Sequence, residues 1–453
     1  MRLAMAAALA IPWSSIAHAA PDPALARQVL LRSVAYASVE GSDQVPRLAG
    51  YYASVLKDAG FLPSEIEIIP FEKTAALAAT LPGSDPALRP IILLGHMDVV
   101  AANRADWERD PFVPVEEGGY IYGRGAEDNK YDVAMMVTML ASLKREGWKP
   151  RRSVILLLSG DEETRMATGA MLAGRYRDAE LVLNGDGGGG LLDEAGKPVF
   201  YQVQAGEKTY ADFEISFTDP GGHSSAPTPG NPIYRLARAI DRIAGFSFPT
   251  MRSELTRESL RLSADRIGGD VGDAMRRFAA TGDEKAADLL SAHPEFVGQV
   301  RTTCVATMAQ AGHAPNALPQ RAMVNVNCRI FPGVEVDAVR ATLAKVIADP
   351  GATIRTLDNP VASAASPLRA DVMAVVRAAV AARHPGIAVL PGMSAGATDS
   401  IHFRALGIPS YGVSSLFQRA EDGFAHGLNE RVPVAGIGAA LAQWEAVVKG
   451  LAK

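Results

Sequence analysis

The sequence of 453 residues predicts an α/β fold: a mostly parallel sheet flanked by helices, with an inserted α+β module that carries an antiparallel sheet. One observation is a series of short, nearly continuous apolar runs, which read IEIIPF, IILLGH, SVILLLSG and ELVLNGDG. Such runs are typical of strands buried on both faces, and helix-like stretches separate some of them. The other observation is a change near Gly206, where apolar and polar residues begin to alternate, as in an antiparallel sheet with one solvated face.

The hydrophobic periodicity gives the elements in chain order. Apolar residues recur at the helical period of roughly 3.6 over residues 21–60, and a strong helical pattern covers 133–145. After the alternating run YADFEISFTD, a helix with an early proline is predicted in NPIYRLARAIDRIAG. The charged stretch 250–298 is predicted to be helical, two strands lie in TTCVATM and AMVNVNCRI, and another helix covers 336–348.

A buried-core pattern returns after about Pro367, in DVMAVVRAAVAARH and IPSYGVSS. We therefore expect a main domain built from two segments, residues 20–206 and 367–453. Residues 207–366 are expected to form a second domain inserted between them.

The first residues have the pattern of a secretory signal peptide. Arg2 supplies a positive start, an apolar run covers residues 3–11, and the Ala-His-Ala sequence at 17–19 fits a cleavage site. A buried first helix is the alternative, which Pro12 inside the run disfavours. We expect residues 1–19 to be removed and the mature protein to be periplasmic or extracellular.

Composition excludes several classes of protein. The formal net charge of −5 is mild and has the wrong sign for a nucleic-acid binder, and no long apolar stretch after the N-terminus predicts a membrane anchor. Two cysteines are too few for a disulfide scaffold or a thiolate zinc cluster. Cys304 and Cys328 would lie opposite each other in a hairpin, and both a disulfide and two separate buried thiols fit the sequence.

Metal-ligand side chains come directly after the buried strand runs. His96 and Asp98 follow IILLG, residues 161–163 (Asp-Glu-Glu) follow VILLLSG, and Asp186 follows LVLNG. Ligand sites in open α/β sheets form at the carboxyl ends of the strands, so these side chains are expected to meet. Carboxylates buried there without partners would cost several kcal/mol, and a metal would remove that cost.

Two more candidates lie outside the strand runs: Asp128 in GRGAEDNK and His426 in GFAHGLNE. Taken alone, Asp128 would be an ordinary N-cap of the helix that follows it. Taken together, two histidines with three or four carboxylates and no cysteine suit a pair of cations such as two Zn²⁺. Two metals about 3.5–4 Å apart also need a bridging carboxylate and a bridging water or hydroxide.

The chain resembles the metallopeptidase family of acetylornithine deacetylase, succinyl-diaminopimelate desuccinylase, aminoacylase and carboxypeptidase G. The motifs occur in the family's order and read GHMDVV, GRGAEDNK, SGDEE, NGDGG, GGHSS, PNALP, CRIFPG, SAGATDS and AHGLNE. The resemblance covers nearly the whole mature chain. The inserted region is most similar to the branch of carboxypeptidase S and the secreted N-acyl-amino-acid hydrolases.

The resemblance implies two Zn²⁺ per subunit, which Co²⁺ or Mn²⁺ could replace. The implied ligands are Asp128 between the metals, His96 and Asp186 on one metal, and Glu163 and His426 on the other. The implied catalytic residues are Glu162 as general base, Asp98 as the partner of the second ring N–H of His96, and His223 as an oxyanion donor. The implied substrate-binding residues are Asn316, Arg329 and Gly396, which face a substrate carboxylate.

The implied reaction is hydrolysis of an amide in a peptide or an N-acyl amino acid by a metal-bound hydroxide, next to a residue with a free carboxylate. The main domain would then be catalytic, and the insertion a lid that closes over it and through which a homodimer could form. The acyl group and the oligomeric state stay open.

Two other functions were weighed. Residues 392–396 fit the G-x-S-x-G elbow of serine hydrolases, with Ser394 as nucleophile, His426 downstream, and Asp399 or Asp422 between them. Only a short segment follows Ser394, and this interpretation leaves the cluster of His96 and the carboxylates without a purpose. An exported peptide-binding protein without catalysis is the second alternative, which the intact set of residues disfavours.

Overall fold

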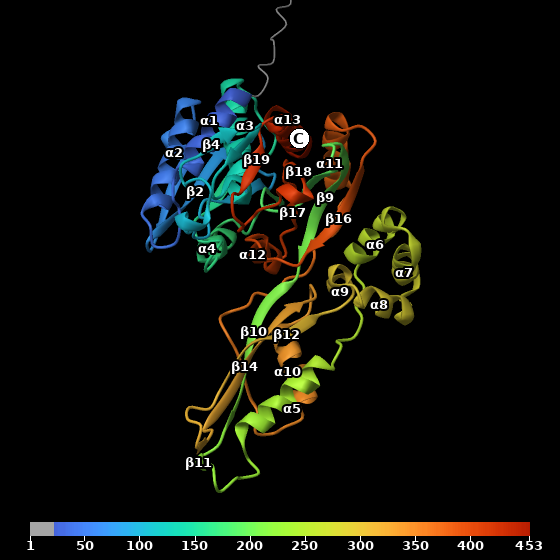
Figure 1. Cartoon of the computed structure of the whole chain (residues 1–453). Coiled ribbons are helices and arrows are strands. Elements are labelled where there is room, and N and C mark those ends of the chain that lie inside the picture. Colours follow the sequence, from blue (N-terminus) through green and yellow to red (C-terminus); the bar gives the residue numbers. More distant parts are fainter. Residues whose placement is uncertain (1–21) are drawn as a thin grey trace, which may run out of the picture.

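The computed structural model describes residues 22–453, so the predicted signal peptide, residues 1–19, lies outside the described residues. Figure 1 shows a large lobe that contains both chain ends of the described part and a smaller lobe that projects from it. The predicted fold class is confirmed, since a mixed, mostly parallel sheet with helices occurs together with a separate antiparallel sheet.

The large sheet has ten strands in the order β1-β2-β6-β3-β7-β17-β9-β8-β18, and β16 pairs with β9. Its centre is parallel, because β3 pairs in parallel with both β6 and β7, and β7 with β17. The strands are β1 (Ile66–Phe71), β2 (Thr74–Leu81), β3 (Ile91–His96), β6 (Val154–Ser159), β7 (Leu181–Asn184), β8 (Gly189–Leu192), β9 (Pro198–Glu207), β16 (Ala388–Ser394), β17 (Ser410–Gly412) and β18 (Phe417–Arg419).

Helices bury both faces of this sheet. In β3, Leu93 packs into a core with one group of helices, and its neighbour Leu94 packs into a second core on the opposite face. The first group comprises α1 (Pro23–Val34), α2 (Gln44–Asp58), α3 (Tyr131–Arg145), α11 (Ala370–Arg383) and α13 (Ile437–Leu451), and the second comprises α4 (Ala167–Arg175) and α12 (Ser400–Ala405). The apolar runs of β3, β6 and β7 are therefore strands buried on both faces, as predicted. The run IEIIPF is the exception, because it forms the edge strand β1, whose residues are half-buried or exposed.

The smaller sheet is antiparallel, in the order β12-β14-β10-β15. Phe213, Ile215 and Phe217 of β10 point into a core beneath two helices, and the polar residues between them lie on the other face. The elements are β10 (Thr209–Thr218), β12 (Thr303–Ala311), β14 (Arg321–Ile330) and β15 (Thr353–Thr356), with helices α5 (Pro232–Ala244) and α10 (Val336–Ile347). Helix α5 begins as predicted, with Pro232 in its first turn and Asn231 as N-cap.

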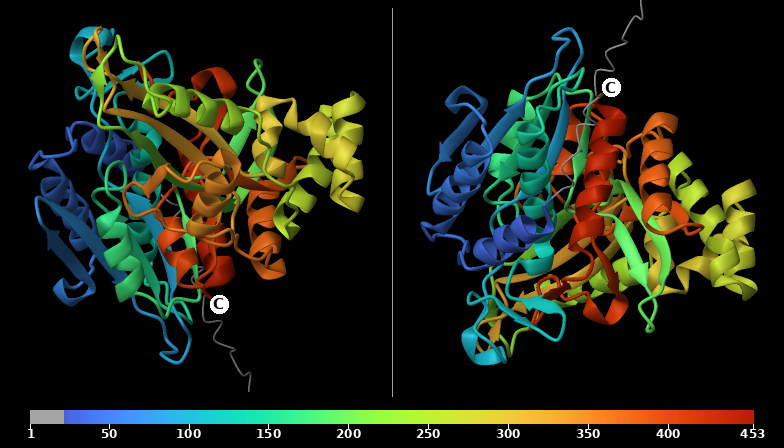
Figure 2. Two further views of the ribbon diagram at one scale, coloured as in Figure 1. Left: turned by 90° about the horizontal axis from the view of Figure 1, so that it is seen from below. Right: turned by 90° about the horizontal axis from the view of Figure 1, so that it is seen from above.

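The charged stretch predicted to be helical forms four helices with their own small core. They are α6 (Glu254–Ile267), α7 (Gly269–Thr281), α8 (Glu284–Ser291) and α9 (Pro294–Val300). Figure 2 shows this group, in yellow, to one side of both sheets in two perpendicular directions.

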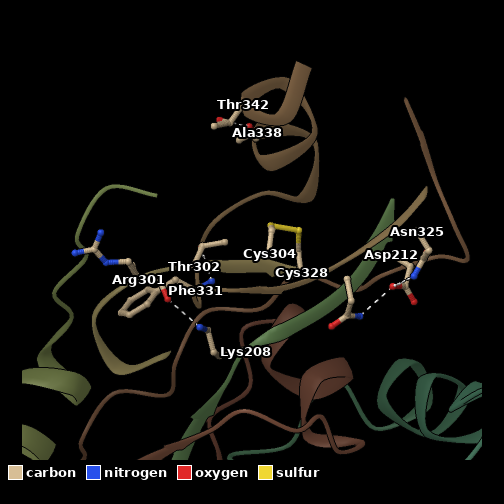
Figure 3. The surroundings of a disulfide bond; sticks show 11 residues. Lys208, Asp212, Arg301, Thr302, Cys304, Asn325, Cys328, Phe331, Ala338 and Thr342 are labelled. Carbon is tan, nitrogen blue, oxygen red and sulfur yellow. Dashed lines mark hydrogen bonds between the residues drawn. A yellow bond between two sulfur atoms is a disulfide. The ribbon is translucent and has the colours of Figure 1, made fainter. Parts of the chain in front are cut away.

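Cys304 and Cys328 form a disulfide (Figure 3). The two residues are directly opposite each other in the register of β12 and β14. The sequence was compatible with a disulfide and with two separate thiols, and the structure has the disulfide. The disulfide links β12, the edge strand of the smaller sheet, to its neighbour β14.

Short elements complete the described chain. A three-stranded sheet in the order β19-β5-β4 joins the C-terminal part to the segment before α3, and a two-stranded ribbon of β11 and β13 lies at the far tip of the smaller lobe (Figure 1). Their bounds are β4 (Val115–Glu117), β5 (Tyr120–Tyr122), β11 (Gly222–His223), β13 (Ala317–Leu318) and β19 (Arg431–Pro433), with the short helical turns η1 (Pro63–Glu65), η2 (Arg104–Asp106), η3 (Ala126–Lys130) and η4 (Ala420–Asp422). Among the helices of residues 22–453, none has the length and apolar character needed to cross a membrane.

Candidate active site

The candidate ligands lie at the carboxyl ends of three adjacent parallel strands. His96 is the last residue of β3, Glu162 and Glu163 follow β6, and Asp186 follows β7. Because β3 pairs with β6 on one side and β7 on the other, the three strand ends lie side by side. The topology that the sequence predicted therefore brings these side chains together.

Asp128 lies between the two histidines. Its Oδ1 is 2.9 Å from Nε2 of His96, and its Oδ2 is 3.2 Å from Nε2 of His426. Asp186 Oδ2 lies 3.9 Å from the same His96 nitrogen, and Glu163 Oε2 lies 2.9 Å from the His426 nitrogen. Two groups of candidate metal ligands result, one of His96, Asp128 and Asp186 and the other of Asp128, Glu163 and His426.

The electrostatics of the cluster fit bound cations. Burial, together with the charge of Asp128, raises the pKa of Asp186 well above its ordinary value, and burial raises the pKa of Glu163 to about 7. Burial and the charge of Asp186 likewise raise the pKa of Glu162. Carboxylates crowded in this way need positive charge to stay ionised, and imidazole with carboxylate is a donor set that Zn²⁺ accepts. The residues present therefore fit a metal centre.

Asp98 supports the cluster from behind. Its Oδ1 and Oδ2 accept hydrogen bonds from the backbone N–H groups of Glu162 and Glu163, at 3.1 and 3.0 Å. The Asp98 backbone oxygen is 3.0 Å from Nδ1 of His96, whereas its Oδ1 is 3.7 Å away from that nitrogen. A carbonyl oxygen can only accept, so Nδ1 carries the proton of this hydrogen bond, and the other ring nitrogen, Nε2, faces Asp128.

A cleft of about 710 Å³ opens between the cluster and the smaller sheet. Glu162, Glu163 and His426 line one side, and Arg329 and Tyr210 line the other. Arg329 Nη1 donates a hydrogen bond to the Ala395 carbonyl oxygen at 2.7 Å, and its guanidinium lies 4.7 Å from the centre of the Tyr210 ring. Arg329 is thereby placed in the same cleft as the candidate ligands, next to the Ala395–Gly396 loop.

Two of the predicted site residues lie elsewhere. His223, on β11, and Asn316, just before β13, are close to each other, and the Ser224 N–H donates to the Asn316 carbonyl oxygen at 3.1 Å. Neither lines the cleft, and β11 lies at the tip of the smaller lobe, away from the large sheet (Figure 1). In this arrangement of the lobes, His223 and Asn316 are not brought to the ligands.

The geometry does not favour the serine-hydrolase alternative. Ser394 Oγ accepts a hydrogen bond from the Gly396 N–H at 3.0 Å, whereas His426 Nε2 faces Asp128 and Glu163. A serine nucleophile needs a histidine within hydrogen-bond reach, and the described contacts of Ser394 include none.

Sequence reasoning missed two residues that contact the segments carrying the candidate ligands Asp128 and His426. Arg124 and Glu430, both buried, form an ion pair at 2.7 Å behind Asp128. Both lie in motifs that also contain a candidate ligand, Arg124 in GRGAEDNK with Asp128 and Glu430 in AHGLNE with His426. The only sequence signal for this pair was that each residue lies close in the chain to a candidate ligand. Nothing in a single sequence showed that the arginine and the glutamate contact each other.

A histidine–carboxylate cluster at the ends of parallel strands, with a cleft beside it, defines a metal-dependent hydrolase built on an α/β sheet. A model of the peptidase family M20/M25/M40 matches residues 92–450, and the chain belongs to this family. The chain is therefore a metallopeptidase or amidohydrolase, as the motifs predicted.

Individual relatives agree with this assignment. The chain is 29% identical over 367 residues to the N-fatty-acyl-amino acid synthase/hydrolase PM20D1 of Mus musculus, covering 78% of this chain and 73% of the relative. It is 30% identical over 275 residues to carboxypeptidase S of Saccharomyces cerevisiae, covering 56% and 47%. Among solved structures, the M20 family metallo-carboxypeptidase Sso-CP2 of Sulfolobus solfataricus has the same fold, with a TM-score of 0.69, 21% identity and coverage of 94% and 98%.

Proposed function

We propose that the protein is a two-zinc amidohydrolase that releases an amino acid with a free carboxylate from a peptide or an N-acyl amino acid. The observation that carries the proposal is the position of Asp128, whose two oxygens lie 2.9 and 3.2 Å from the imidazoles of His96 and His426. The names of two relatives, an N-fatty-acyl-amino acid synthase/hydrolase and a carboxypeptidase, support this substrate class.

His96, Asp128 and Asp186 would hold one zinc ion, and Asp128, Glu163 and His426 the other. Zn²⁺ in such a site supplies Lewis acidity and lowers the pKa of water toward about 7. Co²⁺ or Mn²⁺ could occupy the same oxygen and nitrogen ligands.

Glu162 is the proposed general base. Its carboxylate belongs to neither group of ligands, yet it lines the cleft beside Glu163 and His426. A free carboxylate in this place can accept a proton from the attacking water and pass it to the leaving amine. Asp98 would serve as a positioning residue, since it holds the backbone of Glu162 and Glu163 and the ring of His96.

Arg329 is proposed to bind the substrate carboxylate, because an arginine fork matches a carboxylate and this one already lines the cleft. Gly396 would present its backbone nearby. His223, as oxyanion donor, and Asn316 would act only after the smaller lobe moves or from a second subunit, since neither lines the cleft here.

We also propose that residues 20–206 and 367–453 form the catalytic domain and that 207–366 form the lid, with a homodimer made through it. The disulfide between Cys304 and Cys328 supports export to an oxidising compartment, in line with a signal peptide at 1–19.

The experiment that tests this function is a panel of dipeptides and N-acyl amino acids, assayed with wild type, Glu162→Gln and the control Glu194→Gln in an exposed turn. Glu162→Gln is expected to keep its zinc and to lose about 10²–10⁴-fold in kcat, the typical contribution of a general base. The control is expected to behave as wild type. Full turnover by Glu162→Gln would refute the assignment of Glu162 as general base. Full turnover by metal-free wild type would refute the proposed function.

A further inference from the structure

The buried pair of Arg124 and Glu430 lies directly behind the shared carboxylate Asp128. Glu430 has no exposed surface and Arg124 is 3% exposed. A buried ion pair is costly to desolvate unless its remaining hydrogen-bonding atoms also find partners. What these two side chains bind besides each other therefore indicates what the pair does.

Glu430 holds the segment that carries Asp128. Its Oε1 accepts hydrogen bonds from the backbone N–H groups of Glu127 and Asp128, at 2.8 and 3.1 Å. Its Oε2 accepts from the Gly125 N–H at 2.9 Å and from Arg124 Nη1 at 2.7 Å. One carboxylate thus accepts hydrogen bonds from three backbone N–H groups of residues 125–128. This segment is not a regular helix at Asp128, where φ is −112° and ψ is 95°.

Arg124 holds the segment that carries His426. Its Nη2 donates to the carbonyl oxygens of His426 and Gly427, at 3.2 and 3.1 Å. His426 has a φ of +62°, a left-handed conformation that a non-glycine residue adopts only when its surroundings impose it. The two hydrogen bonds from Arg124 are a direct restraint of that kind.

We propose that Arg124 and Glu430 are positioning residues of the metal centre, which set the distance between Asp128 and His426. Glu430 fixes the backbone of the shared ligand, Arg124 fixes the backbone of the terminal ligand, and their ion pair joins the two segments. This inference rests on the proposed function, in which Asp128 contacts both zinc ions and His426 only one.

The two residues then have different effects on the two metal sites. Loss of the Glu430 charge loosens Asp128, and both zinc ions bind more weakly. Replacement of Arg124 by lysine keeps a charge beside Glu430 but cannot reach both carbonyl groups as well, so only the site of Glu163 and His426 weakens.

The test is a zinc titration of chelator-stripped, full-length protein in competition with a chromogenic chelator. Glu430→Gln is expected to weaken both zinc sites by about 10–100-fold, the usual effect of removing a partner behind a metal ligand. Arg124→Lys is expected to weaken one of the two sites by a similar factor. Glu65→Gln, which breaks the partly buried ion pair with Lys144 on α3, is the matched control and should bind zinc as wild type does.

Thermal unfolding of the metal-free proteins separates positioning from general stability. Unchanged zinc affinity in a folded Glu430→Gln or Arg124→Lys protein would overturn the proposal, as would a weakening that Glu65→Gln reproduces. If Glu430→Gln does not fold, Arg124→Lys decides alone through the weakening of one site. Wild-type protein that binds no zinc would instead refute the proposed function.

Discussion

Arg329 reaches the cleft with its guanidinium already oriented. It lies over the ring of Tyr210, whose hydroxyl donates to Asp212 Oδ2 at 2.6 Å, and Asn327 Nδ2 donates to Asp212 Oδ1 at 3.0 Å. A stacked and hydrogen-bonded guanidinium loses little further freedom when it binds a carboxylate, and its fork still offers several N–H groups. At the scale of the single residue, this placement supports the proposal that Arg329 binds a substrate carboxylate.

Arg329→Ala is expected to raise KM for carboxylate-bearing substrates by roughly tenfold or more, since a hydrogen bond to a charged group contributes about 1.5–3 kcal/mol. Steady-state kinetics with an N-acyl amino acid and with its carboxamide measure the effect. Only the carboxylate substrate should be affected.

Arg321→Ala is the matched control, because Arg321 lies on the same strand, β14, and pairs with Glu214 rather than lining the cleft. An unchanged KM of Arg329→Ala on the carboxylate substrate would remove Arg329 from the binding site.

Sequence reasoning proposed individual candidate ligands where residue type and position after a strand coincide. His96 and Asp186 could be proposed because each follows a buried strand run, whereas Arg124 and Glu430 could not, since their partners are remote in the chain. The family resemblance implied that Asp98 accepts the second ring N–H of His96, and the nearest Asp98 acceptor is its backbone oxygen, at 3.0 Å, rather than Oδ1, at 3.7 Å. A sequence motif identifies the residue that accepts a hydrogen bond, but it does not show whether the backbone or the side-chain oxygen is the acceptor.

At the scale of the elements, strand runs were predicted where β-branched and leucine residues are continuous. Strand β2 was missed, because its sequence TAALAATL is rich in alanine, which has little strand preference. A run of glycines follows Asp186, at residues 187–190. It has a packing role, since a Cβ on Gly190 would lie 2.0 Å from the Phe417 ring of the paired strand β18.

Lys208 is the single residue between β9 of the large sheet and β10 of the smaller one. Its side chain is buried, and its Nζ donates to the Arg301 carbonyl oxygen at 2.8 Å (Figure 3). Burial, followed by the charge of Arg329, lowers the pKa of Lys208 to about 8 from an ordinary value of 10.5. The folded structure therefore disfavours the protonated, charged form of Lys208 at the junction of the two sheets.

This lowered pKa predicts a pH dependence of stability. Between pH 8 and 10.5 the unfolded state binds the Lys208 proton and the folded state does not, so the free energy of unfolding rises with pH in this window. The contribution of this shift to the free energy of unfolding is at most about 3.5 kcal/mol, at ~1.4 kcal/mol for each pKa unit. Lys208→Met is expected to lose this rise, measured by urea unfolding at intervals from pH 7.5 to 10.5.

Lys57→Met, at an exposed position on α2, is the control and should follow wild type. Parallel curves for wild type and Lys208→Met would show that Lys208 is not titrated differently in the two states.

At the scale of the whole molecule, the cleft lies between two sheets that the sequence predicted separately. Their types follow from the hydrophobic pattern, but the pattern says nothing of how far apart the lobes stand. His223 and Asn316 illustrate the limit, since the motifs assigned them to the site and the described arrangement leaves them at the tip of the smaller lobe. Their approach requires motion of a lobe or a second subunit, which side-chain patterns in one chain do not encode.

Anomalous X-ray diffraction at the zinc edge, from crystals of the zinc-loaded protein, tests whether Asp128 lies between two metal ions. We predict two peaks about 3.5–4 Å apart on either side of the Asp128 carboxylate, one beside His96 and Asp186 and the other beside Glu163 and His426. A single peak, or peaks that do not touch Asp128, would contradict this prediction.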